Sequence, residues 1–363
     1  IKNNTAGKYI LKNDIDFSGV NLEAISEFSG ELNGNGKTIS NLEASRGLVI
    51  TNKGTIKNIN IVSSDFNISS DSFTYDASRN GADYSIGIIA ESNAGKISNC
   101  KLAGINYITV NLSEDIDYDI FVDCGSFVGA NLASGVIENC DGYLTDLCLK
   151  GTQNNKSTGF VNAGGICGIN MSGGKISGCS SNTFNIKNDI GINVSACFGG
   201  IAGDSSGNIE NCKAVLSPGS ESFASYGGVV GYNNGDIKNC EIEVDTNSTF
   251  SDYEVVGGIF AEGDATPNSH YVENCIIYPY ESDTNTDFGA FYGASGTAQF
   301  KNCYAIGNFE KYSYSSSSET IAGCEIIKDT EEAKKKSKYA DELWNNGWNI
   351  DEGKSYPYLT LFK

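Results

Sequence analysis

A short phrase that ends in cysteine recurs along most of the chain and constrains its fold more than any other feature. The phrase reads apolar residue, any residue, Asn or Gly, Cys, and it stands at residues 97–100, 137–140, 176–179, 209–212, 237–240, 272–275, 300–303 and 321–324. Two earlier copies, at 39–42 and 56–59, have Leu42 and Ile59 in place of Cys. A phrase repeated at this spacing predicts a stack of similar structural units.

The third position of the phrase predicts a corner in the backbone. Residues three apart on a flat strand point to opposite faces, so Ile237 and Cys240 can both point inward only if the chain bends between them. The intervening position is Asn in eight copies and Gly at Gly178 and Gly323. These residues tolerate the left-handed backbone conformation. We therefore expect a left-handed corner before each cysteine, and stacked Asn side chains that bond to one another along the pile.

A glycine-rich phrase precedes each corner by about ten residues and completes the repeating unit. Clear copies lie at 164–168, 199–203, 227–231 and 257–261, and looser copies at 47–50, 87–90, 125–129 and 289–293. Polar turns such as 232–236 separate the two phrases. A single unit cannot bury its own apolar side, so the units must stack with parallel strands in register. The sequence predicts an all-β, single-stranded parallel β-helix of about ten rungs, roughly 4.8 Å apart.

The cysteines are expected to serve as buried apolar residues. In the stack they form an internal column of mainly free thiols, shielded from oxidants. The chain contains no C-x-x-C pair, which disfavours zinc-ribbon and thioredoxin-like sites. Four cysteines outside the column are the better candidates for a disulfide bridge: Cys124, Cys148, Cys167 and Cys197. The single histidine, His270, lies in a polar stretch and is predicted to be an exposed loop residue.

Three segments resemble a known repeat family. The segment from Gly227 to Cys240, GGVVGYNNGDIKNC, is similar to the GLUG repeat of bacterial cell-surface proteins and of the repeat regions of bacterial immunoglobulin-A peptidases. The opening, at 9–17 and 28–42, and the ending, at 348–359, resemble the first rungs and the closing segment of such regions. The resemblance implies a right-handed β-helix in an extracellular or cell-surface, adhesin-like protein, and it implies no catalytic residues.

The end of the chain predicts a second, small unit. Residues 329–344 have the pattern of a short helix, with Thr330 as a candidate N-cap and acidic residues in the first turn. Such a helix would cover the open end of the stack. We therefore expect a β-helix repeat domain over residues 1–328 and a C-terminal helix and capping segment over 329–363.

The net charge and the composition disfavour several classes of binding partner. The chain has 25 Lys and Arg against 45 Asp and Glu, a net charge of −20, which disfavours nucleic acid. No apolar run reaches the ~20 residues of a membrane span, so we expect no membrane insertion. The carboxylates of Glu114, Asp115, Asp117 and Asp119 are the type of ligand that Ca²⁺ prefers, but their position in an excursion favours a solvent-exposed acidic face. The tyrosines at 278, 280, 312 and 314 suit stacking on sugars but need no such role.

These observations predict a noncatalytic binding or spacer module without cofactor, metal or catalytic residues. Its ligand, a host protein or a glycan, is not identified by any motif, and the long excursions at 63–84 and 103–123 are where a ligand site would lie. A carbohydrate-active enzyme, a polysaccharide lyase or glycoside hydrolase, is the alternative by analogy of fold. A third interpretation is the repeat region of a larger secreted peptidase.

Overall fold

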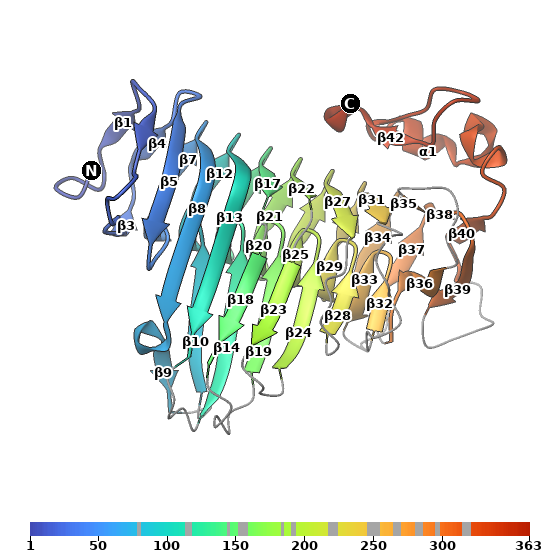
Figure 1. The fold of residues 1–363 in the computed structure, drawn as a ribbon. Helices are drawn as coiled ribbons and strands as arrows, with labels where there is room; N and C mark the ends of the chain where they lie inside the picture. The colour runs from blue at the N-terminus through green and yellow to red at the C-terminus, as the bar shows by residue number, and fades with distance from the viewer. Residues whose placement is uncertain are drawn as a thin grey trace.

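The computed structural model is built almost entirely of parallel β-strands stacked along one axis (Figure 1). It describes residues 1–77, 81–112, 118–143, 146–151, 159–182, 185–189, 194–216, 224–244, 255–263, 270–279, 286–294, 298–313 and 321–363. In Figure 1 the N-terminal strands lie at one end of the stack, and successive coils follow in sequence order toward the other end.

Sheet A contains the strand of each coil that carries the apolar residue opening the phrase. Its strands pair in parallel and in this order: β1 (Lys8–Ile10), β4 (Glu31–Asn33), β7 (Thr55–Lys57), β12 (Lys96–Ser98), β16 (Val136–Glu138), β21 (Lys175–Ser177), β26 (Asn208–Glu210), β30 (Ile237–Lys238), β34 (Tyr271–Glu273) and β37 (Gln299–Lys301). Ile56, Ile97 and Ile137 are paired neighbours in this sheet and are fully buried. The repeated apolar position therefore forms one continuous column in the core.

Sheet B follows sheet A across the corner. Its path is β2 (Ile15–Asp16), β5 (Thr38–Ala44), β8 (Asn60–Ser69), β13 (Lys101–Asn111), β17 (Asp141–Tyr143), β22 (Ser180–Asn182), β27 (Lys213–Leu216), β31 (Glu241–Val244), β35 (Ile276–Pro279), β38 (Cys303–Ile306) and β40 (Cys324–Ile327). Two further strands, β18 (Asp146–Lys150) and β23 (Asn185–Asp189), extend it beside the second half of β13. The described parts of the excursions at 63–84 and 103–123 therefore include paired strands rather than only loops.

The remaining strands form two parallel ladders that join at β36. Ladder C1 contains β10 (Gly81–Gly87), β14 (Asp119–Gly125), β19 (Gly159–Gly164), β24 (Val194–Gly199), β28 (Ala224–Gly227), β32 (Val255–Gly257), β36 (Thr286–Tyr292) and β39 (Phe309–Ser313), and β9 (Thr74–Asp76) pairs antiparallel with β10. Ladder C2 contains β3 (Ile25–Phe28), β6 (Val49–Asn52), β11 (Ala90–Asn93), β15 (Val128–Asn131), β20 (Cys167–Asn170), β25 (Ala202–Ser205), β29 (Val230–Asn233) and β33 (Phe260–Gly263).

The glycine-rich phrase forms the bend between these ladders. Gly199 and Gly227 are paired neighbours at the ends of β24 and β28. A Cβ atom on Gly228, the next residue along the chain, would lie 2.0 Å from the backbone oxygen of Gly258. The coils approach too closely at this bend for any side chain, and this close approach explains the glycines.

The predicted corners are confirmed at all ten positions. Eight Asn residues have φ between 52° and 56°, namely Asn41, Asn58, Asn99, Asn139, Asn211, Asn239, Asn274 and Asn302. Gly178 and Gly323 have φ of 62° and 80°. Part of the predicted Asn ladder is also present, because Asn302, Asn274 and Asn239 each donate from Nδ2 to Oδ1 of the Asn one coil earlier, at 3.0, 3.1 and 3.2 Å.

The cysteines after these corners form the predicted column. Cys100, Cys140, Cys179, Cys212, Cys240, Cys275 and Cys303 are buried, and Cys324 in the last coil is partly exposed. All twelve cysteines of the chain are free thiols in the structure, including the bridge candidates Cys124, Cys148, Cys167 and Cys197. Register, corners and buried columns are together consistent with a parallel β-helix.

The C-terminal segment differs in detail from the predicted helix. Residues 329–344 contain two 3-10 turns, Glu332–Lys334 and Lys336–Lys338, and one α-helical turn, α1 (Asp341–Trp344). Asp329, rather than Thr330, accepts the backbone N–H groups of Glu331 and Glu332. The buried residues Ala333, Tyr339 and Leu343 are six and four positions apart, and the spacing of six does not continue one apolar stripe along an α-helix.

The same segment packs against the side of the last coils. Ala333, Tyr339, Leu343, Trp348 and Leu359 are buried in one cluster with Ile276, Tyr304 and Ile306 of sheet B. Two short antiparallel strands, β41 (Trp348–Asn349) and β42 (Tyr358–Leu359), complete it, with 3-10 turns at Thr360–Phe362 and, earlier in the chain, at Ser70–Ser72. In Figure 1 the segment doubles back over β31 and β35. That it also caps the open end of the stack stays a prediction.

Candidate functional site

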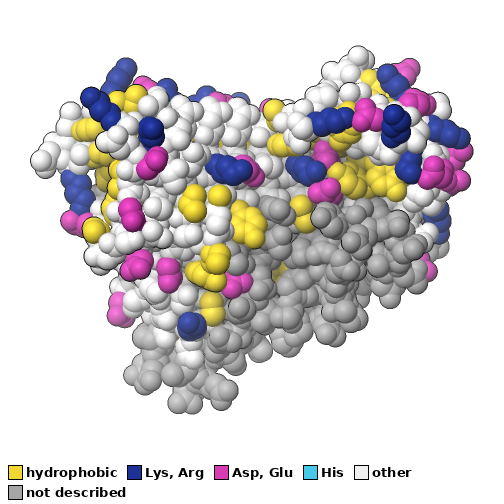
Figure 2. Space-filling view, turned by 45° about the horizontal axis from the view of Figure 1, so that its top comes forward, with side chains coloured by type: hydrophobic (Ala, Val, Ile, Leu, Met, Phe, Trp, Pro, Cys, Tyr) yellow, Lys and Arg dark blue, Asp and Glu magenta, His cyan; other side chains and the backbone are white. Residues whose placement is uncertain are grey.

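The outer face of sheet B carries a groove with a volume of about 430 Å³. It is lined by residues of two neighbouring strands, Lys101–Ile105 on β13 and Asp141–Tyr143 on β17. Figure 2 shows hydrophobic side chains gathered near the middle of one face, with lysines and carboxylates around them. The groove lies where the predicted excursion at 103–123 leaves the repeat.

A β-bulge opens this groove. In the pairing of β13 with β8, Ala103 lies opposite Val62 and Asn106 opposite Ser64, so Gly104 and Ile105 face the single residue Ser63. Gly104 has φ of 73°, which favours glycine. On its other side β13 pairs with β17 only at Lys101 and resumes pairing with β18 at Tyr107. The interval between these two points is the floor of the groove.

Asn106 holds the bulge in place. Its side chain is fully buried and spans three strands. Its Oδ1 accepts from the Ser64 hydroxyl at 2.8 Å, and its Nδ2 donates to the backbone oxygens of Tyr143 at 2.8 Å and Ala103 at 3.2 Å. The groove is therefore pre-formed, because its backbone is fixed by buried hydrogen bonds.

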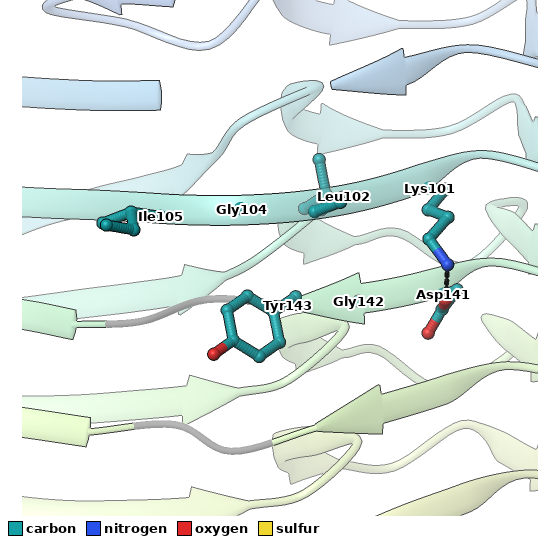
Figure 3. A pocket seen from close by; sticks show the side chains of 8 residues that line it. Lys101, Leu102, Gly104, Ile105, Asp141, Gly142 and Tyr143 are labelled. Atoms are coloured by element: carbon teal, nitrogen blue, oxygen red, sulfur yellow. Dashed lines mark ion pairs between the residues drawn. The ribbon is translucent and has the colours of Figure 1, made fainter. Parts of the chain in front are cut away.

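The lining is polar at one end and apolar at the other. Lys101 Nζ lies 2.8 Å from Asp141 Oδ2, and the Ser180 hydroxyl donates to Asp141 Oδ1 at 2.8 Å. Figure 3 shows this ion pair at one end and the side chains of Ile105 and Tyr143 toward the other. Ile105 is 53% exposed. Such an arrangement can accept hydrogen bonds from a ligand and also pack against its apolar parts.

A second cleft, of about 220 Å³, lies between sheet B and the C-terminal segment. Glu241 is buried there, with Oε1 2.9 Å from Lys213 Nζ and Oε2 accepting the backbone N–H of Leu359 at 2.7 Å. The hydroxyl of Tyr278 donates to Glu241, and burial raises the pKa of this tyrosine well above its usual value. Of these contacts, the Leu359 bond joins the segment to the sheet, whereas those of Lys213 and Tyr278 with Glu241 lie within sheet B.

Two half-buried aspartates lie between ladders C1 and C2. Asp123 on β14 accepts from Asn162 Nδ2 at 2.9 Å. Burial raises its pKa to about 6, with a contribution from the charge of Asp204. Burial also raises the pKa of Asp204, on β25, to about 6. Raised carboxylate pKa values are frequent at catalytic sites but also occur in structural positions.

The structure places His270 and part of the acidic cluster at 114–119. The prediction that His270 is exposed is wrong. It is 1% accessible, because its ring packs edge-on against Phe260 of β33, with ring centroids 6.5 Å apart. Of the acidic cluster, Glu114, Asp115 and Asp117 lie outside the described residues, and Asp119 lies in β14. Among described residues, no three His, Cys, Asp or Glu side chains are grouped to hold a metal ion.

Two of the four tyrosines that suit stacking on sugars make contacts within the protein. Tyr278 is bonded to Glu241, and Tyr312 packs against Phe291 with ring centroids 5.6 Å apart. Tyr280 and Tyr314 lie outside the described residues. No sequence signal identifies Tyr143, because the residue type at its position varies between coils, with Asn182 in the next coil and Tyr278 in a later one.

Comparisons with known proteins give one structural neighbour to report. No family model matches the chain, and no curated protein matches it. The neighbour is a crystal structure from Bacteroides ovatus that bears the name "putative immunoglobulin A1 protease". The two chains align with a TM-score of 0.35 and 16% identity, over 98% of this chain and 86% of the other. None of the described helices is long and apolar enough to cross a membrane.

Proposed function

We propose that this protein is a noncatalytic, extracellular, adhesin-like binding module, built as a right-handed parallel β-helix of the GLUG-repeat type. The pre-formed groove between β13 and β17 carries the proposal. Its floor is fixed by the buried Asn106, and its lining combines an ion pair with exposed apolar side chains. A rigid scaffold that bears an amphipathic groove loses little conformational entropy when a ligand binds.

Burial of the thiols is compatible with the proposed extracellular location. An oxidising compartment favours disulfides between accessible cysteines. In the column from Cys100 to Cys303 each cysteine is buried, and its sulfur donates to a backbone oxygen, as Cys240 does to Lys238 at 3.4 Å. Free thiols of this kind are compatible with secretion because an oxidant has no direct access to them.

The test is a binding screen of the intact chain against glycan and surface-protein arrays. A ligand that binds the wild-type chain and loses affinity on Tyr143→Ala would support the proposal. An exposed Glu43→Gln variant on the same sheet serves as the matched control. The absence of any ligand would leave a spacer role for the rod.

A carbohydrate-active enzyme is a second candidate, favoured by the aspartates between ladders C1 and C2. Glycoside hydrolases use a pair of carboxyl groups, one of which stays protonated near neutral pH. Asp123 and Asp204, with pKa values of about 6, suit that requirement. Release of reducing or unsaturated ends from a polysaccharide panel, abolished in Asp204→Asn, would establish it. The third candidate, the repeat region of a larger secreted peptidase, is tested by the sequence of the full open reading frame.

A further inference from the structure

One column of polar side chains runs across five consecutive strands of sheet B. Its members are paired neighbours in the ladder: Lys101, Asp141, Ser180, Lys213 and Glu241. Twice in this column, a lysine is followed in the next coil by a carboxylate, as Lys101 is by Asp141 and Lys213 is by Glu241. The open groove lies at the first of these pairs and the C-terminal segment covers the second.

The two pairs have the same geometry. Lys101 Nζ lies 2.8 Å from Asp141 Oδ2, and Lys213 Nζ lies 2.9 Å from Glu241 Oε1. In each pair one carboxylate oxygen forms the ion pair with the lysine. The other accepts a further donor, the Ser180 hydroxyl for Asp141 and the backbone N–H of Leu359 for Glu241. A carboxylate oxygen can accept two hydrogen bonds, so Asp141 retains acceptor capacity.

The pair Lys213–Glu241 shows what kind of polypeptide segment can bind to this face of sheet B. Its occupant is an extended segment, β42, that places a backbone N–H on the carboxylate and packs Leu359 against the sheet. Tyr356 packs against Tyr278, with ring centroids 5.8 Å apart and the rings tilted by 47°. Residues 354–363 carry two lysines and no acidic side chain, and so complement a chain with a net charge of −20.

The pair Lys101–Asp141 has the same arrangement of lysine and carboxylate, but no described segment lies over it. The side chains of Lys101 and Asp141 are 56% and 46% exposed, whereas that of Glu241 is 2% exposed. Ile105 and Tyr107 add exposed apolar surface beside them. Among the described residues, no segment covers this surface, whereas the equivalent surface three coils later lies under the C-terminal segment.

We propose that the groove at Lys101–Ile105 and Asp141–Tyr143 binds an extended, basic, aromatic-rich polypeptide segment of another protein, whose backbone N–H bonds to Asp141 while its apolar side chains pack on Tyr143 and Ile105. This rests on the proposed binding function and names the class of its partner. Extended peptides commonly dock in this way, with main-chain bonds for affinity and side-chain pockets for specificity.

The probe is a synthetic peptide with the sequence of residues 354–363, labelled with a fluorophore and carrying a photo-reactive benzophenone at the position of Phe362. We expect saturable binding to the intact chain by fluorescence anisotropy. Asp141→Asn and Tyr143→Ala should each weaken it at least about tenfold, which corresponds to ~1.4 kcal/mol. Glu43→Gln and a scrambled peptide of the same composition are the controls. Circular dichroism verifies that each variant is folded.

Photo-crosslinks mapped by mass spectrometry locate the bound peptide. Crosslinks within 101–105 or 141–143 support the inference, and Ile105→Ser should reduce them independently of the Tyr143 variant. Crosslinks near Glu241 would mean that the peptide displaces the chain's own segment, and would overturn it. Absence of saturable binding, or equal binding of the scrambled peptide, would also overturn it. A ligand found on the arrays would in those cases leave the proposed binding function standing.

Discussion

Asn274 donates a hydrogen bond from its Nδ2 atom to Oδ1 of Asn239 at 3.1 Å, although the two residues are 35 positions apart in the chain. Both have left-handed backbones, with φ of 56° and 52°. The same residue type therefore meets two needs, since it makes the corner and it ties one coil to the next. This dual role explains why Asn rather than Gly occupies most of the corners.

Replacing Asn239 separates these two roles. Asn239→Ala removes both ladder bonds and places a Cβ-bearing residue without local polar compensation in the left-handed region. It should destabilise the fold by about 1–3 kcal/mol. Asn239→Gly loses the bonds but keeps the backbone, so its cost should be about 1 kcal/mol lower. Urea denaturation followed by circular dichroism measures both. Equal losses for Ala and Gly would contradict the importance of the left-handed corner.

A second ladder lies inside the stack and was not predicted. Asn52, Asn93 and Asn131 each donate to the Asn of the next coil, at 2.8, 2.8 and 2.9 Å, and all are fully buried. Asn131→Leu would leave the Nδ2 of Asn93 and the Oδ1 of Asn170 without these partners. The expected cost is about 2–5 kcal/mol, because each unsatisfied buried group costs about 1–3 kcal/mol. Met171→Gln, exposed beside the same turn, should change the denaturation midpoint little.

The sequence predicted those features that depend on a single repeated position. The corners, the glycine bend and the cysteine column each follow from one residue type and its spacing. The inner ladder has a weaker signal, because Asn stands six residues after the first glycine of the glycine-rich phrase in several coils, but Ser205 and Gly263 interrupt the series. The groove was not predicted because it depends on a register shift between β8 and β13. The sequence of one strand does not show how it pairs with a strand that is distant in the chain.

Burial in the column makes its thiols unreactive. Burial raises the pKa of the Cys140 and Cys179 thiols well above the usual value, so little thiolate forms. With iodoacetamide at pH 8, these should be modified at least about a hundredfold more slowly than the partly exposed Cys148, because labelling requires local opening. Mass spectrometry of peptides gives the rates. All twelve cysteines should react in guanidinium, and rapid labelling of the native column would argue against its burial.

The half-buried aspartates predict that stability falls as pH rises. Burial raises the pKa of Asp123 and Asp204 to about 6, above the value near 3.9 of an unfolded chain. The native state therefore binds more protons between about pH 4 and pH 6, and stability is lost across this window as pH increases. Asp204→Asn should stabilise the protein by about 1–3 kcal/mol at pH 7. At pH 3.5, where the aspartate is already protonated, the variant should match the wild type.

Glu241 is predicted to hold the C-terminal segment on the sheet. Glu241→Ala removes the acceptor for the Leu359 N–H and for the Tyr278 hydroxyl, and it leaves Lys213 with only the more distant Glu243, at 3.4 Å. Only the Leu359 bond joins the segment to the sheet directly, and its loss should shift the segment toward an open state by about 1–3 kcal/mol. Chymotrypsin should then cut after Tyr358 at least about tenfold faster, because cleavage of a locally opened segment follows its population. The denaturation midpoint of the coils should also fall, because Glu241 contacts Lys213 and Tyr278 in the two adjoining coils, so digestion is measured under native conditions where the coils remain folded. Equal digestion of Glu241→Ala and the exposed control Glu43→Gln would show that apolar packing around Leu343 and Trp348 suffices to hold the segment.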